Sequence, residues 1–122
     1  MPKEHPERRH YKRIKKNFIL TYFDLAHPED KFEATQLKNI SLGGMCLVTS
    51  RSFNPSTYLG IELKTPFFAE LTHLEGIILE SHERIKGIIY ETRLEFKQLS
   101  PQAEFVLNKI IEYFDKQEQG YP

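Results

Sequence analysis

The sequence predicts a mostly β fold, a small antiparallel barrel or sandwich with one C-terminal helix. Short segments rich in aromatic and β-branched residues recur along the chain, separated by turn-forming residues. Only the last segment, from residue 100 onward, places apolar residues at helical spacing. A length of 122 residues fits one domain, and a hydrophobic content of 39% supports a packed core. Strands followed by a single amphipathic helix are typical of a small β domain that a helix closes.

The first half of the chain predicts three strands. Residues 18–23 form an aromatic and β-branched run without Pro or Gly, and residues 24–30 contain a His-Pro-Glu-Asp turn signature. Residues 32–38 alternate imperfectly and predict a second strand. Residues 45–49 predict a third. Between the second and third strands, residues 39–44 are rich in Asn, Ser and Gly, which favour turns.

The second half predicts three more strands. Residues 59–63 alternate apolar with other residues, and residues 71–80 predict a strand, with a short helix between 67 and 83 as the alternative. A hairpin loop at 81–84 joins this segment to a strand at 87–96. In that last strand the side chains expected to face inward are Ile88, Tyr90, Thr92, Leu94 and Phe96. The carboxylates expected to face solvent are Glu75, Glu80, Glu83, Glu91 and Glu95.

The C-terminal segment predicts a helix with a defined start. Ser100 is a good N-cap residue, and Pro101 suits the first helical position. The apolar residues that follow at i, i+3, i+4 and i+7 spacing form a stripe typical of a core face. They are Ala103, Val106, Leu107, Ile110 and Phe114.

Charge is distributed unevenly although the formal net charge is zero. Residues 1–16 carry seven basic and two acidic side chains, and the rest of the chain carries 10 basic and 15 acidic ones. The pattern predicts a flexible basic arm over residues 1–16, a barrel over 17–99 and a helix over 100–118. It indicates a local anion site, or an arm folded back on its own domain, rather than a large nucleic-acid surface. We find no apolar leader and no membrane-spanning run, so the expected location is the cytoplasm.

Candidate catalytic and metal groups are few. The single cysteine, Cys46, rules out an intramolecular disulfide and lies in an apolar run, where a buried position is expected. The five histidines have no metal-ligand spacing, so no metal site is predicted. Ser41 lacks the sequence context of a hydrolase nucleophile. The sequence therefore does not favour an enzyme.

Two short motifs carry the functional signal. Arg9-x-x-x-Arg13 precedes the first strand, and Asn39-x-Ser41-x-x-Gly44 follows the second. In this order and at this separation they resemble the two signatures of the PilZ domain, the bacterial receptor module for cyclic di-GMP. A final strand reading Tyr-x-x-x-Leu-x-Phe over residues 90–96, followed by the Ser-Pro helix start, extends the resemblance over residues 7 to about 115.

The resemblance implies a six-stranded antiparallel β-barrel of the split-barrel type with a C-terminal amphipathic helix, and no catalysis. The ligand-binding residues it implies are Arg8, Arg9, Arg13, Asn39, Ser41, Gly43 and Gly44. Planar guanidinium forks suit phosphate and the O6/N7 edge of guanine, and the Asn39 oxygen suits the N–H groups of guanine's Watson–Crick edge. Ser41 can donate to phosphate or base. The paired glycines permit positive φ and close approach of backbone N–H groups to the ligand.

Three residues refine this expectation. In the family, Arg immediately before the first motif arginine accompanies binding of an intercalated ligand dimer, so Arg8 favours two ligand molecules. Family members often carry Asp where this chain has Asn39, which implies weaker binding here. Arg93 stands near a position where many members carry Gly, and its side chain either crowds the ligand face or contacts the ligand.

The function implied is a cyclic di-GMP receptor that passes ligand binding to a downstream protein in motility, biofilm formation or secretion, with no cofactor and no membrane insertion. The alternative is an adaptor of the same fold that acts without ligand, although such members usually lack the arginines. A single-stranded RNA binder with a basic arm is a third reading, which the balanced charge disfavours.

Overall fold

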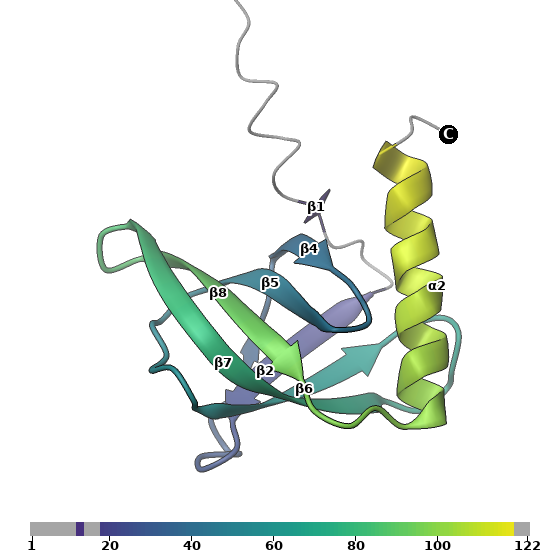
Figure 1. The fold of residues 1–122 in the computed structure, drawn as a ribbon, viewed down its shortest axis with the longest axis horizontal. Coiled ribbons are helices and arrows are strands. Elements are labelled where there is room, and N and C mark those ends of the chain that lie inside the picture. The colour runs from purple at the N-terminus through teal and green to yellow at the C-terminus, as the bar shows by residue number, and fades with distance from the viewer. Residues whose placement is uncertain (1–11, 14–17, 119–122) are drawn as a thin grey trace, which may run out of the picture.

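The computed structural model describes residues 12–13 and 18–118, of which 12–13 are described for their backbone. One antiparallel sheet and one helix make up this part of the chain (Figure 1). The strands are β1 (Lys12–Arg13), β2 (Ile19–Asp24), β3 (Phe32–Glu33), β4 (Gln36–Ile40), β5 (Gly44–Thr49), β6 (Tyr58–Lys64), β7 (Thr72–Ile85) and β8 (Ile89–Phe96), and the helix is α2 (Pro101–Glu118).

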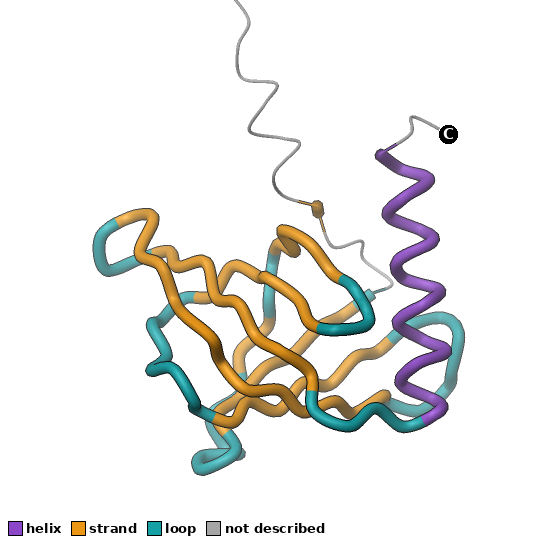
Figure 2. The backbone as a smooth tube through the Cα atoms, viewed as in Figure 1, coloured by secondary structure: helices purple, strands orange, loops and turns teal. Residues whose placement is uncertain are grey.

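The sheet has the strand order β1-β4-β5-β8-β7-β6-β2-β3 and curls into a half-barrel (Figure 2). This confirms the predicted fold and corrects its strand count. Six strands have five residues or more, as predicted. The two-residue strands β1 and β3 form the edges and bring the total to eight among residues 12–13 and 18–118. Short edge strands expose few unpaired backbone groups, which limits edge-to-edge association.

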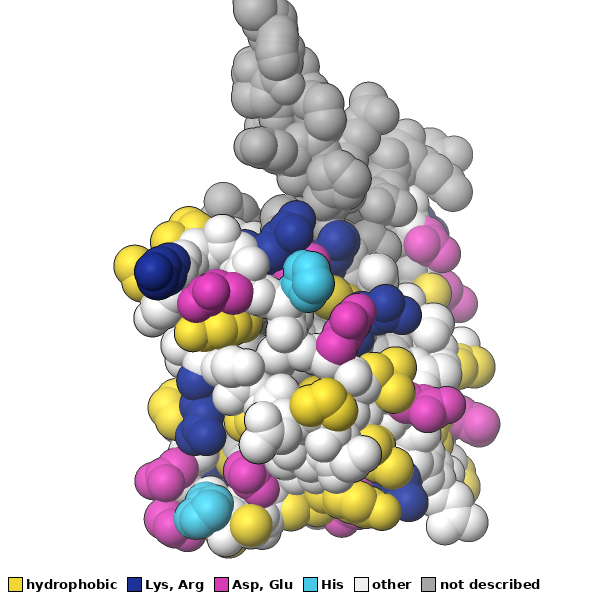
Figure 3. All heavy atoms as spheres, turned by 60° about the vertical axis from the view of Figure 1, so that its left-hand side comes forward, with side chains coloured by type: hydrophobic (Ala, Val, Ile, Leu, Met, Phe, Trp, Pro, Cys, Tyr) yellow, Lys and Arg dark blue, Asp and Glu magenta, His cyan; other side chains and the backbone are white. Residues whose placement is uncertain are grey.

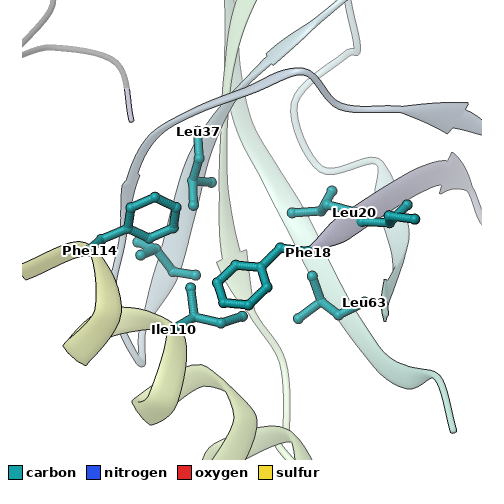
Figure 4. A pocket seen from close by; sticks show the side chains of 8 residues that line it. Phe18, Leu20, Leu37, Leu63, Ile110 and Phe114 are labelled. Carbon is teal, nitrogen blue, oxygen red and sulfur yellow. The ribbon is translucent and has the colours of Figure 1, made fainter. Parts of the chain in front are cut away.

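The core lies between the curled sheet and α2. Alternate residues of β6 point inward, and Leu59, Ile61 and Leu63 are at most 3% exposed. In β8 the predicted inward face is confirmed at Thr92 and Leu94, but Ile88 precedes the strand and is 61% exposed. Between α2 and the sheet remains a cavity of about 20 Å³ with an apolar lining (Figure 4). A space of this size without polar partners does not hold a ligand or an ordered water.

The helix begins as the sequence predicts. The Ser100 hydroxyl accepts a hydrogen bond from the Ala103 N–H at 3.1 Å, and the Ser100 carbonyl accepts one from the Glu104 N–H at 2.9 Å. The predicted stripe faces the core, since its five residues are at most 4% exposed. The stripe belongs to the same core cluster as the inward residues of the sheet, and α2 lies along one side of the sheet (Figure 1).

The predicted second strand is two strands. Residues 32–38 divide into β3, which pairs with β2, and β4, which pairs with β5. The break falls at Ala34, which is 5% exposed and donates its N–H to the Leu20 carbonyl at 2.9 Å. The chain thus passes from one edge of the sheet to the strand beside the other edge, which explains the imperfect alternation.

The predicted hairpin loop at residues 81–84 is wrong. Strand β7 continues to Ile85, and the turn occupies residues 86–88, closed by a hydrogen bond from the Ile88 N–H to the Ile85 carbonyl at 2.9 Å. Gly87 has a φ of 69°, which glycine adopts at little cost. Residues 81–84 are polar because most of this hairpin is exposed, and two register shifts near Leu79 and Arg84 break the simple alternation.

Candidate functional site

The second motif forms the tight turn between β4 and β5. The Ser41 N–H donates to the Gly44 carbonyl at 2.9 Å, and the Gly43 N–H donates to the Ser41 hydroxyl at 3.1 Å. Asn39, Ser41 and Gly43 are exposed. The Ser41 hydroxyl also donates to the Gly44 carbonyl at 3.4 Å, so Ser41 shapes the turn with its own side chain. Asn39 lies one residue before the end of β4.

The two glycines of this turn differ in the space that surrounds them. A Cβ on Gly44 would overlap the carbonyl oxygen of Leu94 in the neighbouring strand β8. A Cβ on Gly43 would meet only the Ser41 hydroxyl, at an ordinary 3.7 Å. Neither glycine has a positive φ, so the turn does not use the conformational freedom that glycine permits. Gly44 is required because β5 and β8 approach closely there, and the hydrogen bond from the Phe96 N–H to the Gly43 carbonyl at 2.8 Å holds this approach.

A row of four residues on successive strands crosses the sheet from this motif, and we call it the outer row. Asn39 of β4 pairs with Cys46 of β5, Cys46 with Arg93 of β8, and Arg93 with Glu80 of β7. Directly paired residues point to the same face of a sheet. The neighbouring row in β5 and β8, Leu47 with Thr92, is fully buried in the interior, so the outer row faces away from the core.

The outer row ends in an ion pair. Arg93 Nη1 lies 3.2 Å from Glu80 Oε2, and the two side chains are 59% and 49% exposed. Arg93 therefore points out of the barrel, on the face that carries Asn39. Cys46 between them is 2% exposed, and burial, followed by the charge of Glu91, raises the pKa of its thiol. The predicted burial of Cys46 is confirmed.

Beside the outer row, the Glu91 carboxylate forms ion pairs with two basic side chains. Its carboxylate lies 3.1 Å from Lys38 Nζ and 3.1 Å from Arg84 Nε. Glu91 is only 8% exposed, so its expected solvent position was wrong. Lys38 and Glu91 stand 53 residues apart, so no local pattern in the sequence signals this pair. Figure 3 shows side chains of both charges close together on this face of the molecule.

The first motif is partly described. Strand β1 pairs with β4 in the register Lys12 with Leu37 and Arg13 with Gln36. The pairing brings the backbone of Arg13 beside the strand that carries Asn39, although 26 positions separate the two residues in the sequence. Arg8 and Arg9 lie outside the described residues, so their predicted contacts stay predictions.

Other features of the described residues give no second site. Within residues 12–13 and 18–118, no three His, Cys, Asp or Glu side chains gather to hold a metal ion. The histidines of this part, His27, His73 and His82, are exposed. No described helix is long and apolar enough to cross a membrane.

A curled antiparallel sheet, a C-terminal helix and an exposed polar turn define this part of the chain as a small β domain. The model of the PilZ domain matches residues 7–115, and the chain therefore belongs to the PilZ domain family. A search of curated proteins finds no match.

A solved structure shares this fold. The structure of the Bacillus subtilis inhibitor of motility (MotI/DgrA) aligns with a TM-score of 0.59 at 19% sequence identity. The alignment covers 100% of this chain and 59% of that protein, so this chain spans about three fifths of its neighbour's length. At this identity the likeness establishes a common fold.

Proposed function

We propose that this PilZ domain is a receptor for cyclic di-GMP, and that ligand binding changes its contacts with a partner protein. One observation carries the proposal. The family match includes both motifs, and the pairing of β1 with β4 puts the backbone of Arg13 next to the strand that ends in the second motif. Two segments that are distant in sequence thus meet at one edge of the sheet, on the strand that leads into an exposed turn.

The residues have distinct roles in this proposal. Arg9 and Arg13 clamp phosphate and the guanine O6/N7 edge, since a guanidinium presents paired donors in a plane. Asn39 accepts hydrogen bonds from guanine N–H groups, and Ser41 donates its hydroxyl. Arg8 supports a second, intercalated ligand molecule. Because Asn39 brings no charge, binding depends on the arginines more than in a domain with Asp at this position.

Gly43 and Gly44 serve the ligand differently. Gly43 leaves open space above the turn, since only the Ser41 hydroxyl lies near the position of a Cβ. Gly44 has no ligand contact in this proposal. Because it carries no Cβ, strand β5 can lie close to β8, and this pairing puts Asn39 and Arg93 on the same face. This gives the two motif glycines a ligand-facing and a structural role respectively.

Titration calorimetry with cyclic di-GMP tests the proposal. Arg13→Ala removes a charge-assisted bidentate contact worth about 1.5–3 kcal/mol, so the dissociation constant should rise roughly 10- to 150-fold. Lys64→Ala is a matched control, since Lys64 is an exposed cation on β6. Absence of binding by the wild type at tens of micromolar would refute the receptor function. Equal binding by Arg13→Ala would refute the site.

The output we propose is a contact with a motility protein. The solved neighbour is described as an inhibitor of motility, and this is the observation that favours motility over biofilm formation or secretion. An adaptor that acts without ligand is the alternative. A pull-down from bacterial lysate with and without cyclic di-GMP separates them, because a receptor's partner list changes with ligand and an adaptor's does not.

A further inference from the structure

The outer row extends the candidate site beyond the two motifs. Neighbouring strands lie about 4.8 Å apart, so the backbone of Arg93 is roughly 10 Å from that of Asn39, two strands away. The Cys46 side chain between them is 2% exposed, so neighbouring atoms cover it and a guest on this face would contact Asn39 and Arg93 rather than the thiol. A guanidinium on its flexible stem reaches several ångströms, which closes most of that distance. A cyclic dinucleotide bound at Asn39 is wide enough to meet it.

We propose that Arg93 is a further ligand-contacting residue, and that Glu80 is the partner it exchanges for the ligand. The inference rests on the proposed function, since it places Arg93 against the same cyclic di-GMP. Arg93 donates its paired N–H groups to an acceptor of the ligand, either phosphate oxygens or the O6/N7 edge of guanine. In the structure, the carboxylate of Glu80 accepts a hydrogen bond from one of these groups, the Nη1 of Arg93, at 3.2 Å.

The exposed fractions of Glu91 and Glu80 decide which basic side chain can leave its carboxylate partner to bind a ligand. Glu91 is 8% exposed, so taking Lys38 or Arg84 away from it would remove one of the counterions of a nearly buried charge. Glu80 is 49% exposed and is solvated by water when Arg93 leaves. An exposed ion pair contributes little to stability, so the exchange costs little. Arg93 is therefore the described cation on this face that is both correctly oriented and readily released.

Glu80 then weakens ligand binding in two separable ways. It competes for the guanidinium of Arg93, and its negative charge repels an anionic ligand. Competition acts only through Arg93, whereas repulsion acts whether or not Arg93 is present. A double-mutant cycle distinguishes these effects, because the change caused by Glu80→Gln disappears in the Arg93→Ala background only in the case of competition.

The experiment is calorimetric titration of cyclic di-GMP into the full chain and its variants at a fixed ionic strength. Arg93→Ala should raise the dissociation constant about tenfold, equivalent to about 1.4 kcal/mol. Glu80→Gln should lower it about threefold, and the double variant should bind like Arg93→Ala alone. The controls are Lys64→Ala on β6 and Glu112→Gln on α2, which remove the same charges at exposed positions outside the outer row. Circular dichroism melting checks that each variant is folded.

The outcomes separate the two hypotheses. If the wild type does not bind cyclic di-GMP at tens of micromolar, the receptor function is refuted and the inference with it. If the wild type binds but Arg93→Ala binds equally well or better, only the inference is overturned. If Glu80→Gln tightens binding equally in the Arg93→Ala background, Glu80 acts by repulsion and the exchange is refuted. A structural role of Arg93 would weaken binding in Glu80→Gln as well, because that variant also loses the ion pair.

Discussion

Substitution of Gly44 by alanine tests the structural account of the second motif. A Cβ at this position would overlap the Leu94 carbonyl oxygen and would lie 3.2 Å from the Glu95 Cα. Both are backbone atoms of β8, so no side-chain rotation relieves the contact. To accept the methyl group, β5 and β8 must move apart where Gly44 pairs with Glu95. The adjoining hydrogen bond from the Phe96 N–H to the Gly43 carbonyl would be strained as well.

The expected cost follows from the kind of atoms that must move. Overpacking a well-packed interior costs about 1–3 kcal/mol, and a contact with immobile backbone belongs at the upper end. We therefore expect Gly44→Ala to lower the free energy of unfolding by about 3 kcal/mol and Tm by roughly 10 °C. Gly43→Ala is the matched control, because a Cβ there has open space and its φ is negative or extended. It should stay within about 0.5 kcal/mol of the wild type.

Urea denaturation followed by far-UV circular dichroism gives both free energies, with thermal melting as a second measurement. Two results would contradict the reasoning. One is a Gly44→Ala variant as stable as the wild type, which would mean that β5 and β8 separate without cost. The other is an equal loss in Gly43→Ala, which would mean that the turn, and not the approach of β8, requires glycine.

Two further predictions concern the helix and the cysteine. Ser100→Ala removes the hydroxyl that accepts the Ala103 N–H, so the free energy of unfolding should fall by about 1 kcal/mol, and Ser100→Asp should restore it. The raised thiol pKa of Cys46 means that the folded state holds the thiol proton more tightly than the unfolded state does. Stability should therefore fall as pH rises past the ordinary thiol pKa of about 8.5, more steeply in the wild type than in Cys46→Ala. Parallel pH profiles of the two proteins would contradict this.

Local patterns predicted the elements whose residues interact with near neighbours. The Ser100 cap and the apolar stripe of α2 follow helical spacing, and both are confirmed. The alternation in β6 is likewise a property of one strand. The hairpin between β7 and β8 was misplaced, because a polar run was interpreted as a loop when it is an exposed strand with two register shifts.

The sequence by itself determined the fold family, the helix and the two motifs, because each depends on residue types at fixed spacing along the chain. Only the tertiary structure decided which residues lie next to the two motifs. Arg13 comes beside the Asn39 strand through the pairing of β1 with β4, and Gly44 is required by the approach of β8. Arg93 faces the same side as Asn39 because three strands lie in one register. Such relations join residues that are far apart in sequence, and strand pairing alone brings them together.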